Sequence, residues 1–181
     1  MISIIIIVKN DRGVEKTLHD IFNVISLPEK VETIVVYGSG GKLDDIRKKY
    51  NKAKWIEFVN DTKATITIPQ QRNAGLREAT GDVIIFTDAS CSLDKNWLEV
   101  LYSDYLNGEK IVAGRIETSN PDVINNISAR SNETVSYIQE CATANVLFSK
   151  EVIDKVGWFD ETFEYGSDTD YTWRARNLGF K

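Results

Sequence analysis

The chain of 181 residues has little of what several common protein classes require. Its two cysteines, Cys91 and Cys141, show no C-x-x-C or Cys/His ligand spacing, which argues against a disulfide framework or a structural zinc site. We therefore expect two buried thiols in a reducing compartment. His19 is the only histidine in the sequence, so a Ser-His-Asp triad is not expected and acid–base chemistry would fall to carboxylates.

Excess basic charge and long apolar runs are lacking too. With a net charge of −5 and a pI near 5.0, the chain is not expected to bind nucleic acid, although a local basic pocket could hold one diphosphate. The apolar start at residues 1–8 is far shorter than the roughly 20 residues that span a membrane, and it lacks the basic region of a signal peptide. These features predict a core strand at the N-terminus and a cytoplasmic protein.

Two common nucleotide-binding motifs are missing as well. No G-x-G-x-x-G follows the first apolar segment and no G-x-x-x-x-G-K-[ST] occurs, which argues against the usual dinucleotide fold and against a P-loop. A nucleotidyltransferase would need a glycine-rich phosphate loop after the first strand, and Asn-Asp-Arg-Gly at residues 10–13 is a poor substitute for one.

What the chain does contain is a regular alternation of apolar strands and amphipathic helices. The expected strands are 1–8, 31–37, 55–59, 83–86, 110–117 and 145–149. The expected helices are 14–25, 43–50, 70–79, 93–107, 150–156 and 168–178, with one broken helix or two short ones from Asn120 to about Ile138. This alternation predicts one α/β domain, built on a mostly parallel sheet with helices on both faces.

The most informative segment is a short apolar run that ends on a carboxylate. Residues 83–86 read as a strand buried on both faces, and Asp88 follows directly. Because ligands of open parallel sheets bind beyond the carboxyl ends of the strands, we expect Asp88 at the mouth of a site. The alternative is that Asp88 and Ser90 only form a turn and cap the next helix.

Several motifs occur together in an order that is typical of one family. They include Gln71-Arg-Asn-Ala-Gly75, Ile84-Ile-Phe-Thr-Asp88-Ala, Val156-Gly-Trp-Phe-Asp160 and Gly166-Ser-Asp-Thr-Asp-Tyr-Thr-Trp-Arg174. Together with five further segments, these motifs resemble the family 2 glycosyltransferases of the GT-A fold. The further segments are the strands at 3–10 and 33–36 and residues 79–82, 96–98 and 143–148. The resemblance covers nearly the whole chain.

This resemblance implies an enzyme that moves a sugar from a nucleotide-sugar donor to an acceptor hydroxyl, with inversion in a single displacement. Residues 1–117 would form the nucleotide-binding half and residues 118–181 the acceptor and catalytic-base half. A divalent metal, Mg²⁺ or Mn²⁺, would neutralise the leaving diphosphate. The acceptor would be a saccharide or a lipid-linked one, in which case segments outside this chain would bring the protein to the cytoplasmic membrane face.

On the donor side the resemblance implies roles for Asp88, Ser90, Tyr37 and Lys9. Asp88 matches the leading Asp of the family's D-x-D motif, but Ser90 stands where the metal-binding carboxylate is expected. Three alternatives follow: Asp88 could bind the metal instead, Asp94 could reach back to the metal, or the enzyme could depend little on metal. Tyr37 replaces an acidic residue that reads uracil, and its ring could stack on a base. Lys9 could approach a phosphate or reach solvent.

Two further residues complete the expected site. Arg72 is the best local cation for the diphosphate, unless it is a surface residue paired with Glu78 or Asp82. Asp168 matches the family's catalytic base, with Ser167 in place of the usual preceding Glu. The alternative for this segment is a capping box, and we assign that capping role to Asp170.

The acceptor wall would come from residues 113–115 and 143–145, with Trp158, Phe159 and Trp173 either stacking on sugars or packing in the core. The losses at Gly38, Ser90 and Ser167 leave open a rival reading, a degenerate GT-A domain that only binds carbohydrate or protein. A metal-binding His that family members often carry after the last helix has no counterpart here, so we also expect that the chain could be cut from something longer.

Overall fold

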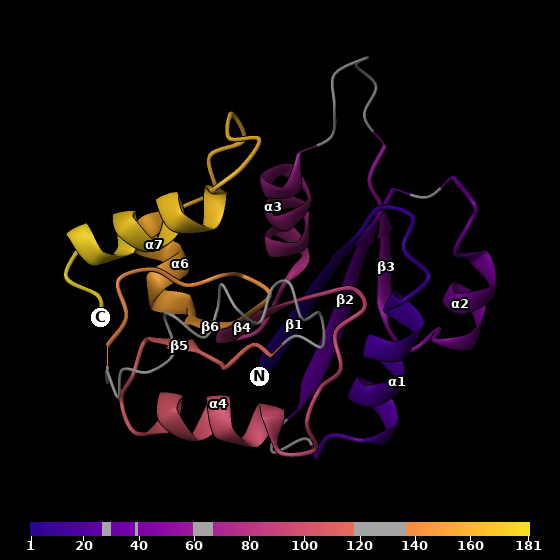
Figure 1. The fold of residues 1–181 in the computed structure, drawn as a ribbon, viewed down its shortest axis with the longest axis horizontal. Coiled ribbons are helices and arrows are strands. Elements are labelled where there is room, and N and C mark those ends of the chain that lie inside the picture. The colour runs from indigo at the N-terminus through magenta and orange to yellow at the C-terminus, as the bar shows by residue number, and fades with distance from the viewer. Residues whose placement is uncertain (27–29, 39, 60–66, 118–136) are drawn as a thin grey trace.

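The structure, a computed structural model, describes residues 1–26, 30–38, 40–59, 67–117 and 137–181. Six strands form one sheet in the order β3-β2-β1-β4-β6-β5 (Figure 1). Their bounds are β1 Ile2–Val8, β2 Val31–Tyr37, β3 Lys54–Glu57, β4 Val83–Asp88, β5 Ile111–Ala113 and β6 Asn145–Ser149.

The sheet is mostly parallel, as the alternation predicts. The pairs β1·β2, β1·β4 and β2·β3 are parallel, whereas β6 runs antiparallel to both of its neighbours, β4 and β5. Ile7 of β1 pairs with Asp88 of β4, so the carboxyl ends of the two central strands meet at one edge of the sheet. That edge is where ligands of such sheets bind.

Helices cover both faces of the sheet, which confirms that prediction. Their bounds are α1 Val14–Asn23, α2 Asp44–Lys49, α3 Ile68–Glu78, α4 Trp97–Leu106, α6 Lys150–Val156 and α7 Ser167–Asn177. Figure 1 shows α3, α6 and α7 above the sheet and α1 and α4 below it. The isoleucines of β1 alternate between the two cores, with Ile4 and Ile6 packing with α1 and α4 and Ile5 packing with α3.

Helix α3 lies very close to the sheet because Gly75 has no side chain. A Cβ on Gly75 would lie 2.5 Å from Cγ2 of Ile5. The helix begins at Ile68, two residues before the predicted start, since Pro69 is tolerated in a first turn and the Gln70 side chain accepts a hydrogen bond of 3.0 Å from the Thr67 amide.

The last third of the chain departs furthest from the sequence prediction. The strand expected at 110–117 is only Ile111–Ala113, at the edge of the sheet, and the Gly114 amide then donates to the Asn145 carbonyl at 2.9 Å. Most of the helix expected between Asn120 and Ile138 lies outside the described residues, and residues 137 and 138 are not helical. Within the described part of the chain, no helix is both long and apolar enough to cross a bilayer.

Candidate active site

Three residues predicted for the site lie together although they are far apart in the sequence. Asp88 ends β4, Arg72 projects from α3, and Asp168 lies in the first turn of α7. Burial raises the pKa of Asp88, while Arg72 lowers it and Asp168 raises it. Burial lowers the pKa of Arg72, opposed by the negative charges of Asp88 and Asp168. The two carboxylates are thus close enough to sense one shared cation.

Arg72 is a buried residue, with 6% of its surface exposed. Its Nη1 donates to Oγ of Ser167 at 3.0 Å, and the guanidinium carbon lies 5.4 Å from the centre of the Phe159 ring. The alternative of a surface arginine is wrong, because Glu78 pairs with Lys54 and Asp82 pairs with the N-terminal amine. The contact of Arg72 with a diphosphate stays a prediction.

The first turn of α7 contains no capping box. Gly166 precedes the helix in a left-handed conformation with φ of 73°, and Ser167 accepts the hydrogen bond of Arg72 instead of capping a backbone amide. Asp170 accepts a bond of 2.9 Å from Nε of Arg174, one turn later. The capping role assigned to Asp170 is therefore wrong. Asp168 is left partly exposed, with one carboxylate oxygen accepting from the Thr169 amide at 3.1 Å.

Ser90 has a partner that the sequence reasoning missed. Ser90 lies just beyond β4 with φ of 66°, and its Oγ donates to Oδ2 of Asp11 at 2.7 Å. The other oxygen of Asp11 accepts from the Gly13 amide at 2.8 Å. A carboxylate thus lies beside the position where the D-x-D motif has lost one. The available signal was that Asp11 follows β1, the parallel neighbour of β4.

These residues fit a divalent metal only in part. The described residues contain no group of three or more His, Cys, Asp or Glu side chains arranged to hold a metal ion. Asp94 does not reach back, because its carboxylate accepts from the Asn96 amide at 2.9 Å in its own turn. Mg²⁺ and Mn²⁺ can be held by one or two carboxylates together with substrate phosphates, and Asp88 with Asp11 nearby suits that arrangement.

The two remaining donor-side candidates differ in their placement. Tyr37 is a core residue with 2% of its surface exposed, its ring centroid lies 5.6 Å from that of Trp55 in a T-shaped pair, and its hydroxyl accepts a hydrogen bond from Arg47. This placement contradicts the prediction that the Tyr37 ring stacks on a base, because the ring is buried and the Arg47 guanidinium lies over it, 5.6 Å from the ring centroid. Lys9 is exposed directly after β1, at the same edge as Asp88.

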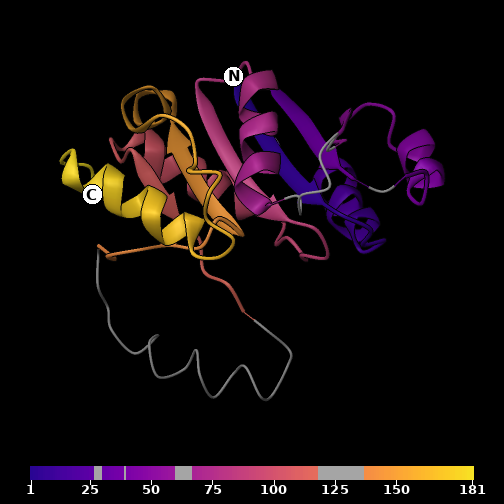
Figure 2. The same ribbon diagram turned by 90° about the horizontal axis from the view of Figure 1, so that it is seen from above.

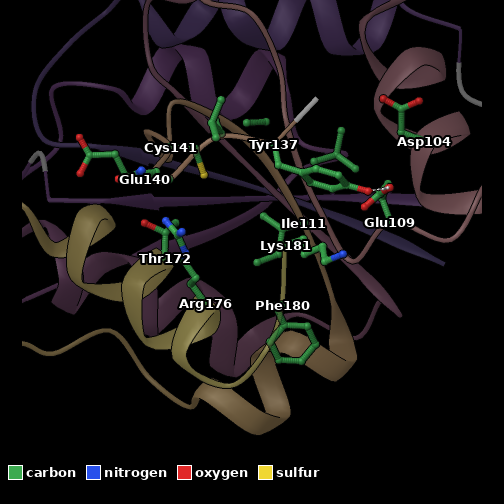
Figure 3. Close-up of a pocket in the computed structure, with 14 residues that line it drawn as sticks. Asp104, Glu109, Ile111, Tyr137, Glu140, Cys141, Thr172, Arg176, Phe180 and Lys181 are labelled. Atoms are coloured by element: carbon green, nitrogen blue, oxygen red, sulfur yellow. Dashed lines mark hydrogen bonds between the residues drawn. The ribbon is translucent and has the colours of Figure 1, made fainter. Parts of the chain in front are cut away.

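A cavity of about 650 Å³ opens beside α7 (Figure 3). Figure 3 shows Thr172 and Arg176 of α7 across from Cys141, and Ile111 of the edge strand lies between them and Glu109. Burial raises the pKa of Cys141 to about 12, and the charge of Asp168 adds to that rise. The cavity therefore adjoins the α7 turn that carries Asp168. Cys141 and Cys91 are both free thiols.

Comparison with known proteins decides the family. The profile described as Glycosyl transferase family 2 matches residues 3–158. The chain belongs to glycosyl transferase family 2. Glycosyltransferase AglE from Haloferax volcanii is 26% identical to this family 2 chain over 196 residues, an alignment that spans 99% of the chain and 62% of AglE.

Solved structures show that this family 2 chain has the GT-A fold. The mannosyltransferase PcManGT from Pyrobaculum calidifontis, in complex with GDP-Man and Mn²⁺, superposes with a TM-score of 0.74 at 17% identity, over 99% of this chain and 53% of PcManGT. Residues 1–349 of S. aureus TarS in complex with UDP-GlcNAc give a TM-score of 0.67 at 18% identity, over 96% of this chain and 52% of that TarS fragment. The chain thus spans 62% of AglE, 53% of PcManGT and 33% of TarS.

Proposed function

We propose that this family 2 domain transfers a sugar from a nucleotide-sugar donor to an acceptor hydroxyl with inversion of the anomeric centre. The observation that carries the proposal is the position of Arg72, which reaches from α3 to Ser167, the neighbour of Asp168, and whose positive charge acts on both Asp88 and Asp168. One carboxylate lies on the sheet and the other on the α7 side. A donor and an acceptor held between them would be aligned for one displacement.

Asp168 is the proposed general base. The acceptor oxygen attacks the anomeric carbon, the bond from that carbon to the diphosphate oxygen breaks, and Asp168 takes the hydroxyl proton. One oxygen of Asp168 is held by the Thr169 amide, which orients the carboxylate. Proton removal by a positioned carboxylate contributes roughly 10² to 10⁴ in rate.

Asp88, Lys9 and Ser90 form the proposed donor side, at the ends of β1 and β4. Asp88 would hold the ribose or a divalent metal, and the metal, when bound, supplies charge neutralisation of the leaving diphosphate. Lys9 carries the exposed positive charge suited to a phosphate. Ser90 keeps the turn after β4 joined to Asp11. Arg72 is the proposed cation for the diphosphate, and in the structure its charge is balanced by Asp88 and Asp168.

A nucleotide sugar is the proposed donor class. PcManGT with GDP-Man and TarS with UDP-GlcNAc support a nucleotide-sugar donor in general, and both GDP and UDP belong in the test. A saccharide is the proposed acceptor class. We also propose that the protein is cytoplasmic. A lipid-linked acceptor would place the reaction at the cytoplasmic face of the membrane.

A thermal-shift experiment tests the donor site. UDP, GDP or CDP at saturating concentration should raise the melting temperature, more so with Mn²⁺, and Asp88→Ala should abolish the rise. Hydrolysis of the matching nucleotide sugar by the wild-type chain then tests whether the domain cleaves the bond between the sugar and the diphosphate. If no nucleotide shifts the melting temperature with or without metal, the rival reading of a non-catalytic binding domain replaces this proposal.

A further inference from the structure

The loop that precedes the proposed base is held to α3 at both of its ends. At the first end, the Asn73 side chain accepts from the Phe159 amide and donates to the Phe159 carbonyl, each at 2.9 Å, and it donates to Glu161 at 2.8 Å. At the second end, Arg72 donates to Ser167. Two consecutive residues of α3 therefore fix the loop, and Figures 1 and 2 show it between α3 and the start of α7.

The loop is also ordered within itself. The amide and the hydroxyl of Thr162 both donate to Oδ1 of Asp160, at 2.9 and 2.7 Å, and the Phe163 amide donates to the Asp160 carbonyl at 3.4 Å. Gly166 then turns the chain with a positive φ of 73°, and nothing lies within 4 Å of the place where a Cβ would stand. The glycine is needed for its backbone conformation and not for close packing.

Tyr165 stands out on this fixed loop because 88% of its surface is exposed. Packing of an aromatic ring normally stabilises the folded chain. Phe159 and Tyr171 are packed in this way, stacked in the core with their ring centroids 4.2 Å apart. Three peptide units separate Tyr165 from Asp168, so their Cα atoms are at most about 11 Å apart. An uncovered aromatic ring thus stands on this hydrogen-bonded loop, three residues before the proposed base.

We propose that Tyr165 forms an acceptor subsite by stacking on the apolar face of a sugar ring of a saccharide acceptor. This inference rests on the proposed function, because it needs an acceptor at Asp168. The C–H groups of one pyranose face are apolar, and an aromatic ring offers them a flat surface at a cost of only two side-chain torsions. Since Asn73 and Arg72 already hold the loop, binding pays little further ordering entropy.

The test compares Tyr165→Ala with Tyr165→Phe as the matched control, which keeps the ring and loses only the hydroxyl. Wild-type chain and variants are assayed with the nucleotide sugar that the wild type hydrolyses fastest. Methyl α- and β-glycosides of glucose, galactose, mannose and N-acetylglucosamine serve as acceptor probes. Tyr165→Ala should raise the KM for the best glycoside about three- to tenfold with a small change in kcat, and Tyr165→Phe should leave it within twofold.

Donor hydrolysis, with water as acceptor, separates this inference from the proposed function. Tyr165→Ala should hydrolyse the donor at the wild-type rate. If the acceptor KM is unchanged in Tyr165→Ala, the subsite is overturned but the proposed transferase function stands. The same holds if no glycoside accepts sugar while donor hydrolysis proceeds. A wild-type chain that neither binds nor hydrolyses any nucleotide sugar would overturn both.

Discussion

The guanidinium of Arg72 donates a hydrogen bond of 3.0 Å to the hydroxyl of Ser167, and this bond joins α3 to the first residue of α7. The family pattern has a glutamate at this position, which would give the arginine a charged partner. With serine there, the positive charge of Arg72 is balanced over a longer range by Asp88 and Asp168. Asp88 and the proposed base Asp168 are thus linked electrostatically through one buried cation.

Ser167→Ala is expected to lower the free energy of unfolding by about 1–3 kcal/mol, because it leaves a buried charged donor without its acceptor. Ser167→Thr keeps the hydroxyl and serves as the control. Urea denaturation monitored by tryptophan fluorescence measures both. Equal stability of Ser167→Ala and wild type would show that Arg72 finds another acceptor.

Asp168→Asn is expected to lower kcat by roughly 10² to 10⁴ while nucleotide binding persists, since the amide cannot take the acceptor proton. Steady-state transfer assays and the nucleotide-induced thermal shift provide the two readouts. Asp170→Asn is the matched control in the same helical turn, where the carboxylate pairs with Arg174. Comparable loss of kcat in both variants would argue against Asp168 as the base.

Asp88→Asn is expected to make the unliganded chain more stable at pH 7. Burial raises the pKa of Asp88 in the folded state, so ionisation costs stability as pH rises through that raised value. Asparagine removes this cost, and its advantage should vanish below about pH 4, where Asp is protonated in both states. Denaturation at both pH values gives the difference, and a less stable Asp88→Asn at pH 7 would refute the argument.

Ser90→Asp is expected to lower the melting temperature by a few degrees without metal, because the new carboxylate would face Asp11, whose Oδ2 now lies 2.7 Å from the serine hydroxyl. Mn²⁺ should restore the loss if the two carboxylates share it. The double variant Asp11→Asn/Ser90→Asp removes the repulsion and is the control. A Ser90→Asp chain indifferent to Mn²⁺ would count against a metal at this edge.

Gly75→Ala is expected to destabilise the chain by about 1–3 kcal/mol, although alanine is the better helix former. The added Cβ would lie 2.5 Å from Ile5, inside the core between α3 and β1. Thermal unfolding of the variant measures the effect. A melting temperature at or above the wild-type value would mean that α3 can move away from the sheet without cost.

Local pattern was sufficient for most elements of the fold. The apolar run of β1 and the helical periodicity of α1 each carry their own period, so both could be predicted from short windows of sequence. The place of β6 between β4 and β5 could not, because the order of strands is set by pairing between segments distant in the chain. The length of β5 was overestimated for the same reason, because the pairing that ends this strand involves a distant segment.

For the site, the sequence alone determined the residue types and the order of motifs, and hence Asp88, Arg72 and Asp168 as candidates. Only the tertiary structure decided that Arg72 is buried against Ser167, that Tyr37 belongs to the core, and that Asp11 lies beside Ser90. The physical reason is that strand and helix periodicity is written into neighbouring residues. Burial and partner choice instead depend on side chains that meet from separate elements.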